Sequence, residues 1–282
     1  MEQEGRPATG TWFSGIFPGS KQSADIDTTV AHPARVYDYW LGGKDNFAAD
    51  REAAERVLAV APGLRFRVKA NRAFLARSVR FLATECNVRQ FLDIGTGIPT
   101  ANNTHEVAQA AAPSSRIVYV DNDPIVLAHA RALITSTPEG ATAYLEADLR
   151  EPDTILAAAR QTLDFSQPIA LMLLGILHLI QDADKPYQIV AHLMDALPSG
   201  SYLVVSHPAS DIHANQAEVQ RRYNERVATP QTLRSHAQVC RFFDGLQLVP
   251  PGVVYVHTWR ADPDEEPPAE MVSAHGGMAR KP

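Results

Sequence analysis

Short apolar runs alternate along the chain with longer stretches in which apolar residues recur every three or four positions. The short runs predict strands at 90–94, 117–120, 142–146, 169–174, 202–206 and 252–257. The longer stretches predict helices near 103–111, 125–134, 152–160, 186–196, 215–224 and 230–241. Strands that alternate with helices form a parallel sheet with helices on both faces. The pattern therefore predicts a three-layer α/β/α sandwich.

Three of the predicted helices carry a start signal. Asn103 and Glu106 have the spacing of a capping box, and Asp123 is a cap residue followed by proline at the first helical position. Thr229 followed by Pro230 repeats that second pairing. The helix of 230–241 is therefore expected to begin at Pro230.

An N-terminal helical cap is expected before the first strand. Helical patterns at 34–40, 47–60 and 64–83 lie within residues 28–85, which we assign to this cap. Residues 1–27 and 261–282 contain much Gly, Pro, Ser or Glu and lack apolar periodicity, so both are expected to be disordered tails. The domain that carries the binding site is then expected at 86–260.

Composition narrows the classes of function. The net charge of -6 gives no positive field to attract phosphates, so no nucleic-acid partner is expected. Cys86 and Cys240 have neither disulfide nor metal-site spacing, and no metal is expected. The longest apolar run, 169–180, is shorter than the roughly 20 residues of a membrane-spanning helix, and no signal-peptide pattern is present. These features predict a cytoplasmic protein without a membrane partner, and they leave its oligomeric state undefined.

A glycine-rich turn follows the first predicted strand. Asp93 lies in the strand, and Gly95 and Gly97 lie in the turn before a helix, so the backbone can approach a ligand closely there. Asp121 ends the second strand 24 residues after Gly97, the spacing at which an acid accepts hydrogen bonds from ribose hydroxyls. Asp148 follows the third strand. Acids at three successive strand ends favour an adenosine-type ligand in a Rossmann-like domain.

Three positions discriminate between nucleoside ligands. The dinucleotide fingerprint has a third glycine where this chain has Thr100. A carboxylate at Asp93 repels a pyrophosphate but suits the ammonium group of an amino acid. Both features favour S-adenosylmethionine as the cofactor. An NAD-dependent oxidoreductase is the alternative that Thr100 and Asp148 disfavour.

At these motifs the chain resembles the class I methyltransferases, and two longer segments narrow the resemblance. Residues 34–46, ARVYDYWLGGKDN, and 99–106, PTANNTHE, are similar to the S-adenosyl methyltransferase-like family of actinomycetes, long labelled a domain of unknown function. The resemblance extends over roughly residues 33–259.

The resemblance implies a cofactor, a sheet and several residue roles. S-adenosylmethionine would place its methionine part at Asp93, Gly95 and Gly97, its ribose at Asp121 and its adenine at Asp148 and Leu149. The sheet would have seven strands, mostly parallel, with one reversed strand at the edge. Because the pattern places six strands, residues 246–249 are expected to supply the seventh as a hairpin with 252–257.

Further residues are candidates for the same site. Tyr37, Asn71, Thr100, Asn122 and Gly175 are also expected to bind the cofactor. His178 and His207 follow the fourth and fifth strands, where open parallel sheets bind ligands, so each is a candidate general base. The alternative for each is a histidine that ties a loop to the backbone.

The predicted function is methyl transfer from S-adenosylmethionine to a small-molecule acceptor. The rival hypothesis is a protein that binds S-adenosylmethionine as a sensor or regulator and transfers nothing.

Overall fold

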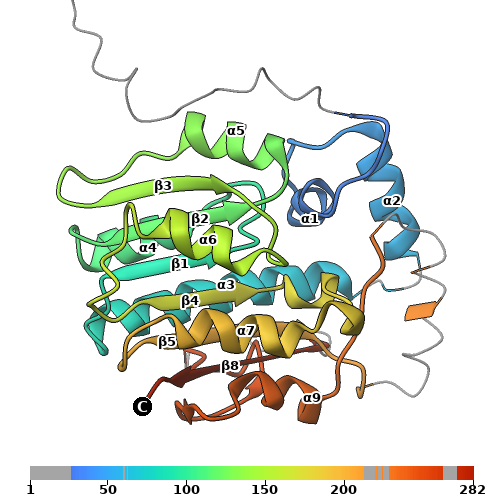
Figure 1. Ribbon diagram of the computed structural model, residues 1–282. Coiled ribbons are helices and arrows are strands. Elements are labelled where there is room, and N and C mark those ends of the chain that lie inside the picture. Colours follow the sequence, from blue (N-terminus) through green and yellow to red (C-terminus); the bar gives the residue numbers. More distant parts are fainter. Residues whose placement is uncertain are drawn as a thin grey trace, which may run out of the picture.

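The computed structural model describes residues 27–59, 61, 63–212, 220–221, 224, 229–262 and 272–282. Within these ranges eight strands form one sheet in the order β3-β2-β1-β4-β5-β8-β6, and β7 also pairs with β8 (Figure 1). The strands are β1 Gln90–Ile94, β2 Arg116–Asp121, β3 Ala141–Glu146, β4 Ala170–Leu174, β5 Tyr202–Pro208, β6 Gln247–Leu248, β7 Val254–Tyr255 and β8 Ala274–Arg280. The expected mixed, mostly parallel α/β sheet is confirmed.

The first five strands are all parallel, and each begins within about two residues of its predicted start. Strands β1 and β4 are buried along their whole length. A strand covered on both faces reads as a continuous apolar run rather than an alternating one. This is the reason that apolar runs such as 169–174 identify these strands in the sequence.

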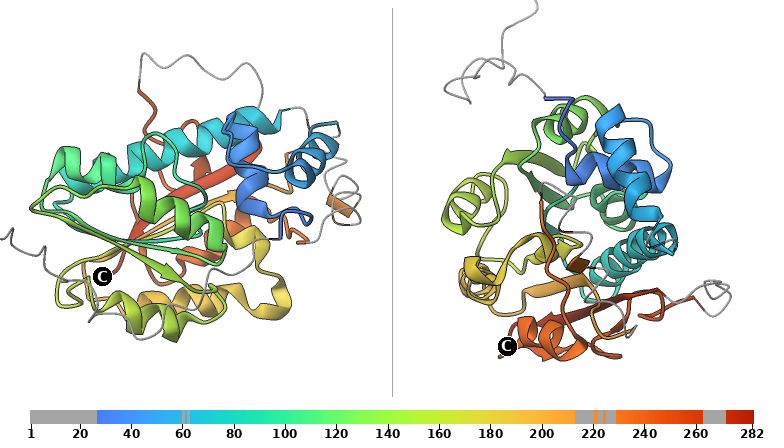
Figure 2. Two further views of the ribbon diagram at one scale, coloured as in Figure 1. Left: turned by 90° about the horizontal axis from the view of Figure 1, so that it is seen from above. Right: turned by 90° about the vertical axis from the view of Figure 1, so that its right-hand side faces the viewer.

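Helices cover both faces of the sheet (Figure 2). One face packs against α6 Pro152–Ala159, α7 Pro186–Asp195 and α9 His236–Cys240, through residues such as Ile155, Leu193 and Val239. The other face packs against α3 Leu64–Thr84 and α4 Thr104–Ala111, with Phe74 and Trp259 meeting edge to face at 5.4 Å. Helix α5, Pro124–Leu133, contacts β2 and β3. The result is the predicted three-layer sandwich.

The N-terminal cap lies at the carboxyl ends of the parallel strands (Figure 1). Helices α1 Pro33–Leu41 and α2 Ala48–Leu58 pack against the first turns of α3 through Trp40, Ala54 and Val68. The Trp40 indole N–H donates to the Ala54 carbonyl oxygen at 3.3 Å. Helix α3 then leaves the cap and runs along the sheet, so one helix connects the cap rigidly to the domain.

The C-terminal part of the chain departs from prediction. Residues 274–280, which were expected to lie in a disordered tail, form β8, and β8 pairs antiparallel with β5 over its whole length. The predicted hairpin between 246–249 and 252–257 is wrong, because β6 and β7 each pair with β8 instead. The reversed strand that the resemblance implies is therefore β8.

Close packing explains the unusual sequence of β8. A Cβ atom at Gly276 would lie 2.8 Å from Val256 Cγ1 and 3.1 Å from the Phe74 ring, and one at Gly277 would lie 3.0 Å from Val253 Cγ2. Two adjacent glycines normally weaken a strand, and for this reason the sequence pattern does not predict this one. Here they admit neighbouring side chains to the backbone.

The helix predicted from Pro230 begins six residues later. Helix α9 starts at His236, with Ser235 as the N-cap that accepts a hydrogen bond from the Gln238 amide. Residues before it are extended, and Arg234 forms a bridge with Ala209. Most of the predicted helix 215–224, and nearly all of the expected tail 1–27, lie outside the described residues. None of the helices in the described part of the chain has the length and apolar character needed to cross a bilayer.

Candidate active site

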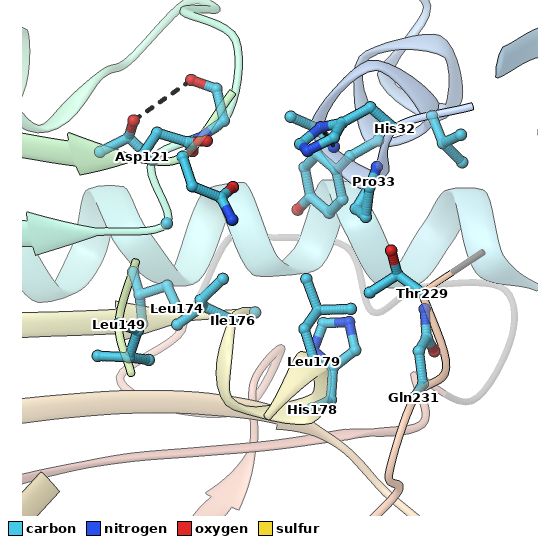
Figure 3. A pocket seen from close by; sticks show the side chains of 18 of the residues that line it. His32, Pro33, Asp121, Leu149, Leu174, Ile176, His178, Leu179, Thr229 and Gln231 are labelled. Carbon is cyan, nitrogen blue, oxygen red and sulfur yellow. Dashed lines mark hydrogen bonds between the residues drawn. The ribbon is translucent and has the colours of Figure 1, made fainter. Parts of the chain in front are cut away.

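A cavity of about 490 Å³ lies where the carboxyl ends of the parallel strands meet the cap (Figure 3). Its walls come from the glycine-rich turn, the ends of β2 and β4, the middle of α3 and the cap. The predicted site residues that line it are Tyr37, Asn71, Asp93, Gly95, Gly97, Asp121, Asn122, Asp148, Leu149, Gly175 and His178. Thr100 and His207 are not among its lining residues.

The glycine-rich turn is fixed to the end of β2 by a carboxylate. The Gly97 amide donates to Asp121 Oδ2 at 2.9 Å, and the Asp123 amide donates to Asp121 Oδ1 at 3.0 Å. Both oxygens keep a second lone pair for another donor. Burial raises the pKa of Asp121, and the two amide hydrogen bonds oppose that rise. A carboxyl group oriented by two backbone amides therefore faces the cavity at the second strand end.

Glycine is required at two points of the cavity wall. Gly95 has φ +75°, and a Cβ atom there would lie 2.6 Å from Ile176 Cγ1. Gly175 has φ +68°, and its Cβ would lie 3.3 Å from Asn71 Nδ2. Side chains rarely adopt this backbone region. The glycines allow the ends of β1 and β4 to approach each other and leave bare backbone toward the cavity.

Asp93 is the acid of the first strand, and it is nearly inaccessible to solvent. Its Oδ2 accepts a hydrogen bond from Thr104 Oγ1 at 2.6 Å. Burial raises the pKa of Asp93 to about 6, although the Thr104 hydrogen bond and the positive charge of Arg72 act in the opposite direction. A buried carboxyl group with few partners would gain stability from a cationic ligand group beside it.

A chain of side chains connects the cap to the sheet at the cavity wall. Ser206 Oγ donates to Asn71 Oδ1 at 2.5 Å, and Asn71 Nδ2 donates to Tyr37 Oη at 3.1 Å. The Tyr37 hydroxyl in turn donates to the Val68 carbonyl at 3.3 Å. Burial raises the pKa of Tyr37, so the hydroxyl stays neutral. Asn71 and Tyr37 thus have defined orientations at the boundary between cap and sheet.

The distinctive segment 34–46 builds the cap as well as the cavity. Tyr37 and Trp40 line the cavity. Asp38 instead closes the turn that follows α1, because its Oδ2 accepts from the Asp45 amide at 3.0 Å and from Asn46 Nδ2 at 2.9 Å. Only part of this motif therefore faces a ligand.

The third strand end carries an ion pair. Asp148 accepts two hydrogen bonds from the Arg150 guanidinium, at 2.9 and 2.7 Å. These bonds lower the pKa of Asp148 against the effect of its partial burial. Leu149, which is buried, provides an apolar surface beside this pair.

Thr100 lies in the loop before α4 and is not among the residues that line the cavity. Its amide donates to Asn103 Oδ1 at 3.0 Å, and Asn103 is the N-cap of α4. Arg72 reinforces this loop by donating to the carbonyl oxygens of Ala101 and Asn102. Thr100 is therefore placed to hold the loop before α4, which does not fit the predicted contact with a ligand.

His207 does not fit its predicted role as a base. The residue is fully buried, its Nδ1 lies 2.8 Å from the Pro208 carbonyl oxygen and its Nε2 lies 2.9 Å from Arg234 Nη1. Because Arg234 can only donate, Nε2 accepts and Nδ1 carries the proton. Burial lowers the pKa of His207 to about 3. His207 is thus the histidine that ties a loop to the backbone.

His178 does line the cavity, on the short helix Leu177–Leu179 that follows β4. Its Nδ1 is buried and has no hydrogen-bond partner among the described residues. Burial lowers its pKa well below the usual value, and the neighbouring His207, Arg67 and Arg234 add to this effect. The imidazole is therefore neutral at physiological pH and has hydrogen-bonding capacity to spare.

Two important residues carry no signal in the sequence pattern. Arg234 is buried, and it donates to the carbonyl oxygens of Leu177 and Ile180 at 2.9 and 3.1 Å, at both ends of the helix that bears His178. His32 lines the cavity, and its Nδ1 lies 2.8 Å from Asp123 Oδ2. The sequence pattern predicts that Arg234 lies in a helix, and His32 precedes the first segment with helical periodicity. Neither position suggests a role in the site.

Comparison with known proteins identifies the family. A family model described as S-adenosyl methyltransferase matches residues 19–282. The chain belongs to this family. It is therefore an S-adenosylmethionine-dependent methyltransferase, and the cavity residues agree with that cofactor. Asp121 offers free acceptor sites for ribose hydroxyls, the bare backbone at Gly95 admits a close ligand, and buried Asp93 suits an ammonium group.

Solved structures resemble this methyltransferase over most of its length. A protein of the DUF574 family from Streptomyces avermitilis is 47% identical, with a TM-score of 0.86 over 91% of this chain and 100% of that one. A candidate methyltransferase from Thermobifida fusca is 41% identical, with a TM-score of 0.83 over 90% and 96% of the two chains. An O-methyltransferase family protein from Burkholderia thailandensis is 14% identical, with a TM-score of 0.50 over 79% and 61%, and shares the fold alone. No curated protein matches the sequence.

Proposed function

We propose that this methyltransferase acts on a small-molecule acceptor that binds in the same cavity as the cofactor. The observation that carries the proposal is the extent of the cavity. Asp121 and Leu149 lie at one end, whereas His178, Leu179, Thr229 and Gln231 lie toward the other (Figure 3). The residues assigned to the cofactor account for the first end. The second end is available for an acceptor.

The second end has the character of a small-molecule site. The apolar residues that the cap and the turn after β4 contribute to the cavity lining are Val30, Val36, Trp40, Val57, Leu179 and Ile180. Small-molecule sites are mostly apolar, with a few polar groups that fix orientation. Here those polar groups are His178, Thr229 and Gln231.

The chain's own residues then hold the two reactants. When bound, S-adenosylmethionine supplies a methyl group on a sulfonium centre that is a good leaving group. Asp121 and Asp93 fix the cofactor, and the cap excludes water from the reaction. Orientation of two bound reactants supplies much of the acceleration of such a displacement.

The rival hypothesis, binding without transfer, expects a shallow or filled acceptor end. The cavity of about 490 Å³, with residues 229 and 231 among its lining, favours transfer instead. The two hypotheses differ in turnover and agree on cofactor binding, so binding and product formation must be measured separately.

The first test is calorimetric titration with S-adenosylmethionine, S-adenosylhomocysteine and NAD. We expect the first two to bind and Asp121→Asn to weaken both, since the variant removes an acceptor from the second strand end. Asp153→Asn is the matched control, because Asp153 is exposed, lies outside the cavity lining and pairs with the exposed His192 on α7. Preference for NAD, or equal binding by the Asp121 variant, would contradict the cofactor site.

The second test measures S-adenosylhomocysteine release after incubation with a cell extract separated into low-mass and macromolecular fractions. Release with the low-mass fraction supports a small-molecule acceptor. Release with the macromolecular fraction alone would refute it, and tight cofactor binding without release in either fraction would favour the rival hypothesis.

A further inference from the structure

We propose that the acceptor is a neutral phenol, whose ring lies in the apolar end of the cavity and whose hydroxyl donates a hydrogen bond to His178. The inference rests on the proposed function, because it names the chemistry of the molecule that fills the acceptor end.

The charges around the acceptor end argue against a cationic acceptor. In the described part of the chain, the carboxylates that line the cavity are Asp93, Asp121 and Asp148, all at strand ends on the cofactor side. Arg56 lines the cavity but is paired with Glu52 at 2.7 Å. An ammonium group buried here would have no carboxylate partner, and burial of an unpaired charge is costly.

His178 has hydrogen-bonding capacity that a ligand hydroxyl would use. Within the described residues, its buried Nδ1 has no partner and its Nε2 makes no hydrogen bond. His178 and Leu179 lie across the cavity from His32 and Pro33 of the cap (Figure 3). A neutral imidazole can accept one hydrogen bond. A hydroxyl on a ligand between these walls would satisfy it.

The surroundings of His178 favour a phenol over an aliphatic alcohol. Burial, together with His207 on β5, Arg67 on α3 and Arg234 before α9, keeps the pKa of His178 low, so the imidazole is a weak base. A weak base serves only a nucleophile that loses its proton readily. A phenol has a pKa of about 10, as the tyrosine side chain does, whereas the pKa values of water and of aliphatic alcohols are far higher.

The proposed methyl transfer needs only the phenol, the cofactor and His178. The phenol oxygen forms a bond to the methyl carbon of the cofactor, and the bond from that carbon to sulfur breaks with its electron pair remaining on sulfur. The phenol proton passes to His178 and then to solvent. The low pKa of His178 favours this release, because burial, and then the neighbouring His207, Arg67 and Arg234, disfavour the imidazolium.

The experiment uses the full-length protein saturated with S-adenosylhomocysteine. Binding is measured by calorimetry for matched hydroxyl, hydroxymethyl, aminomethyl and carboxyl derivatives of benzene, naphthalene and biphenyl. Each assay is repeated with His178→Phe, which keeps a ring but removes the acceptor, and with His178→Gln, which keeps an acceptor oxygen. His192→Ala is the control, because His192 is an exposed residue of α7 whose side chain pairs with Asp153.

We expect the phenols to bind more tightly than the other three derivatives on at least one ring system. His178→Phe should weaken that binding about tenfold, the value of one hydrogen bond, while His178→Gln weakens it less and His192→Ala leaves it unchanged. Tighter binding of an amine, acid or benzylic alcohol would overturn the proposal, as would unchanged phenol binding in His178→Phe or no binding of any phenol. Failure of S-adenosylhomocysteine itself to bind would refute the proposed function as well, which separates the two failures.

Discussion

Arg234 provides the sharpest test of how the site is supported. Its guanidinium donates to the carbonyl oxygens of Leu177 and Ile180, to His207 Nε2 and to Asp182 Oδ1 at 2.6 Å. Only 1% of the residue is exposed. We predict that Arg234→Met, which keeps the length and removes the donors, destabilises the protein and loosens the helix that carries His178.

The expected loss in the free energy of unfolding follows from the hydrogen-bond partners that Arg234→Met leaves unsatisfied. Two carbonyl oxygens and one imidazole nitrogen lose their donor, and each unsatisfied buried acceptor costs about 1–3 kcal/mol. Asp182 is largely exposed, so water can replace its partner. The substitution also removes the cost of burying the charged guanidinium, which offsets part of this loss in stability. We therefore expect a net loss of about 2–4 kcal/mol in the free energy of unfolding.

Urea unfolding followed by circular dichroism measures this loss. Arg234→Lys keeps the charge without the planar fork and should fall between the wild type and Arg234→Met. Arg80→Met is the control, because Arg80 is exposed on α3 and its loss should change stability by no more than about 0.5 kcal/mol. A loss below about 1 kcal/mol for Arg234→Met would show that Arg234 does not hold the helix as described.

Four further predictions address the cofactor site and the sheet. Gly95→Ala should abolish binding of S-adenosylmethionine in calorimetry, because its Cβ would overlap Ile176; near-normal affinity would contradict the close approach. Below pH 6 the affinity should fall about tenfold per pH unit, because Asp93, with a pKa of about 6, becomes protonated and loses its attraction for the ammonium group. Asp93→Asn should remove that pH dependence, and a parallel slope in the variant would refute it. Because the folded pKa of Asp93 exceeds the unfolded value, stability of the cofactor-free protein should also decrease as pH rises from about 4 to 6, as urea midpoints would show. Removal of residues 272–282 should eliminate cooperative unfolding, because it uncovers the β5 edge; a sharp transition in the truncated protein would refute this.

Much of the fold could be predicted because its strands are buried on both faces and its helices are amphipathic. The run from Ala170 to Leu174 needs no partner to be recognised as a strand. Strand β8 could not be recognised, because Gly276 and Gly277 suit their neighbours rather than the strand itself. Its assignment requires Phe74 and Val256 to be in place, and those contacts exist only in the folded protein.

Some residues of the candidate site could likewise be predicted from the sequence, and others could not. Asp93, Gly95 and Asp121 belong to a local motif whose spacing reflects a strand, a turn and the next strand, so the sequence alone places them together. The sequence pattern places both His178 and His207 after predicted strands, yet His178 lines the cavity, whereas His207 lies within β5 and is held by Arg234. That difference depends on a partner more than 25 residues away, which no local pattern reveals.

The position of β8 also bears on how the protein comes to be made. Strand β5 pairs with β4 on one edge, but the partner of its other edge is synthesised only after the whole stretch between Pro208 and Ala274. During that interval the nascent chain presents an open row of backbone donors and acceptors to other chains. Pairings so distant in sequence also form slowly. We therefore expect the yield of native protein to depend on chaperones that shield β5 during translation, more than its final stability would suggest.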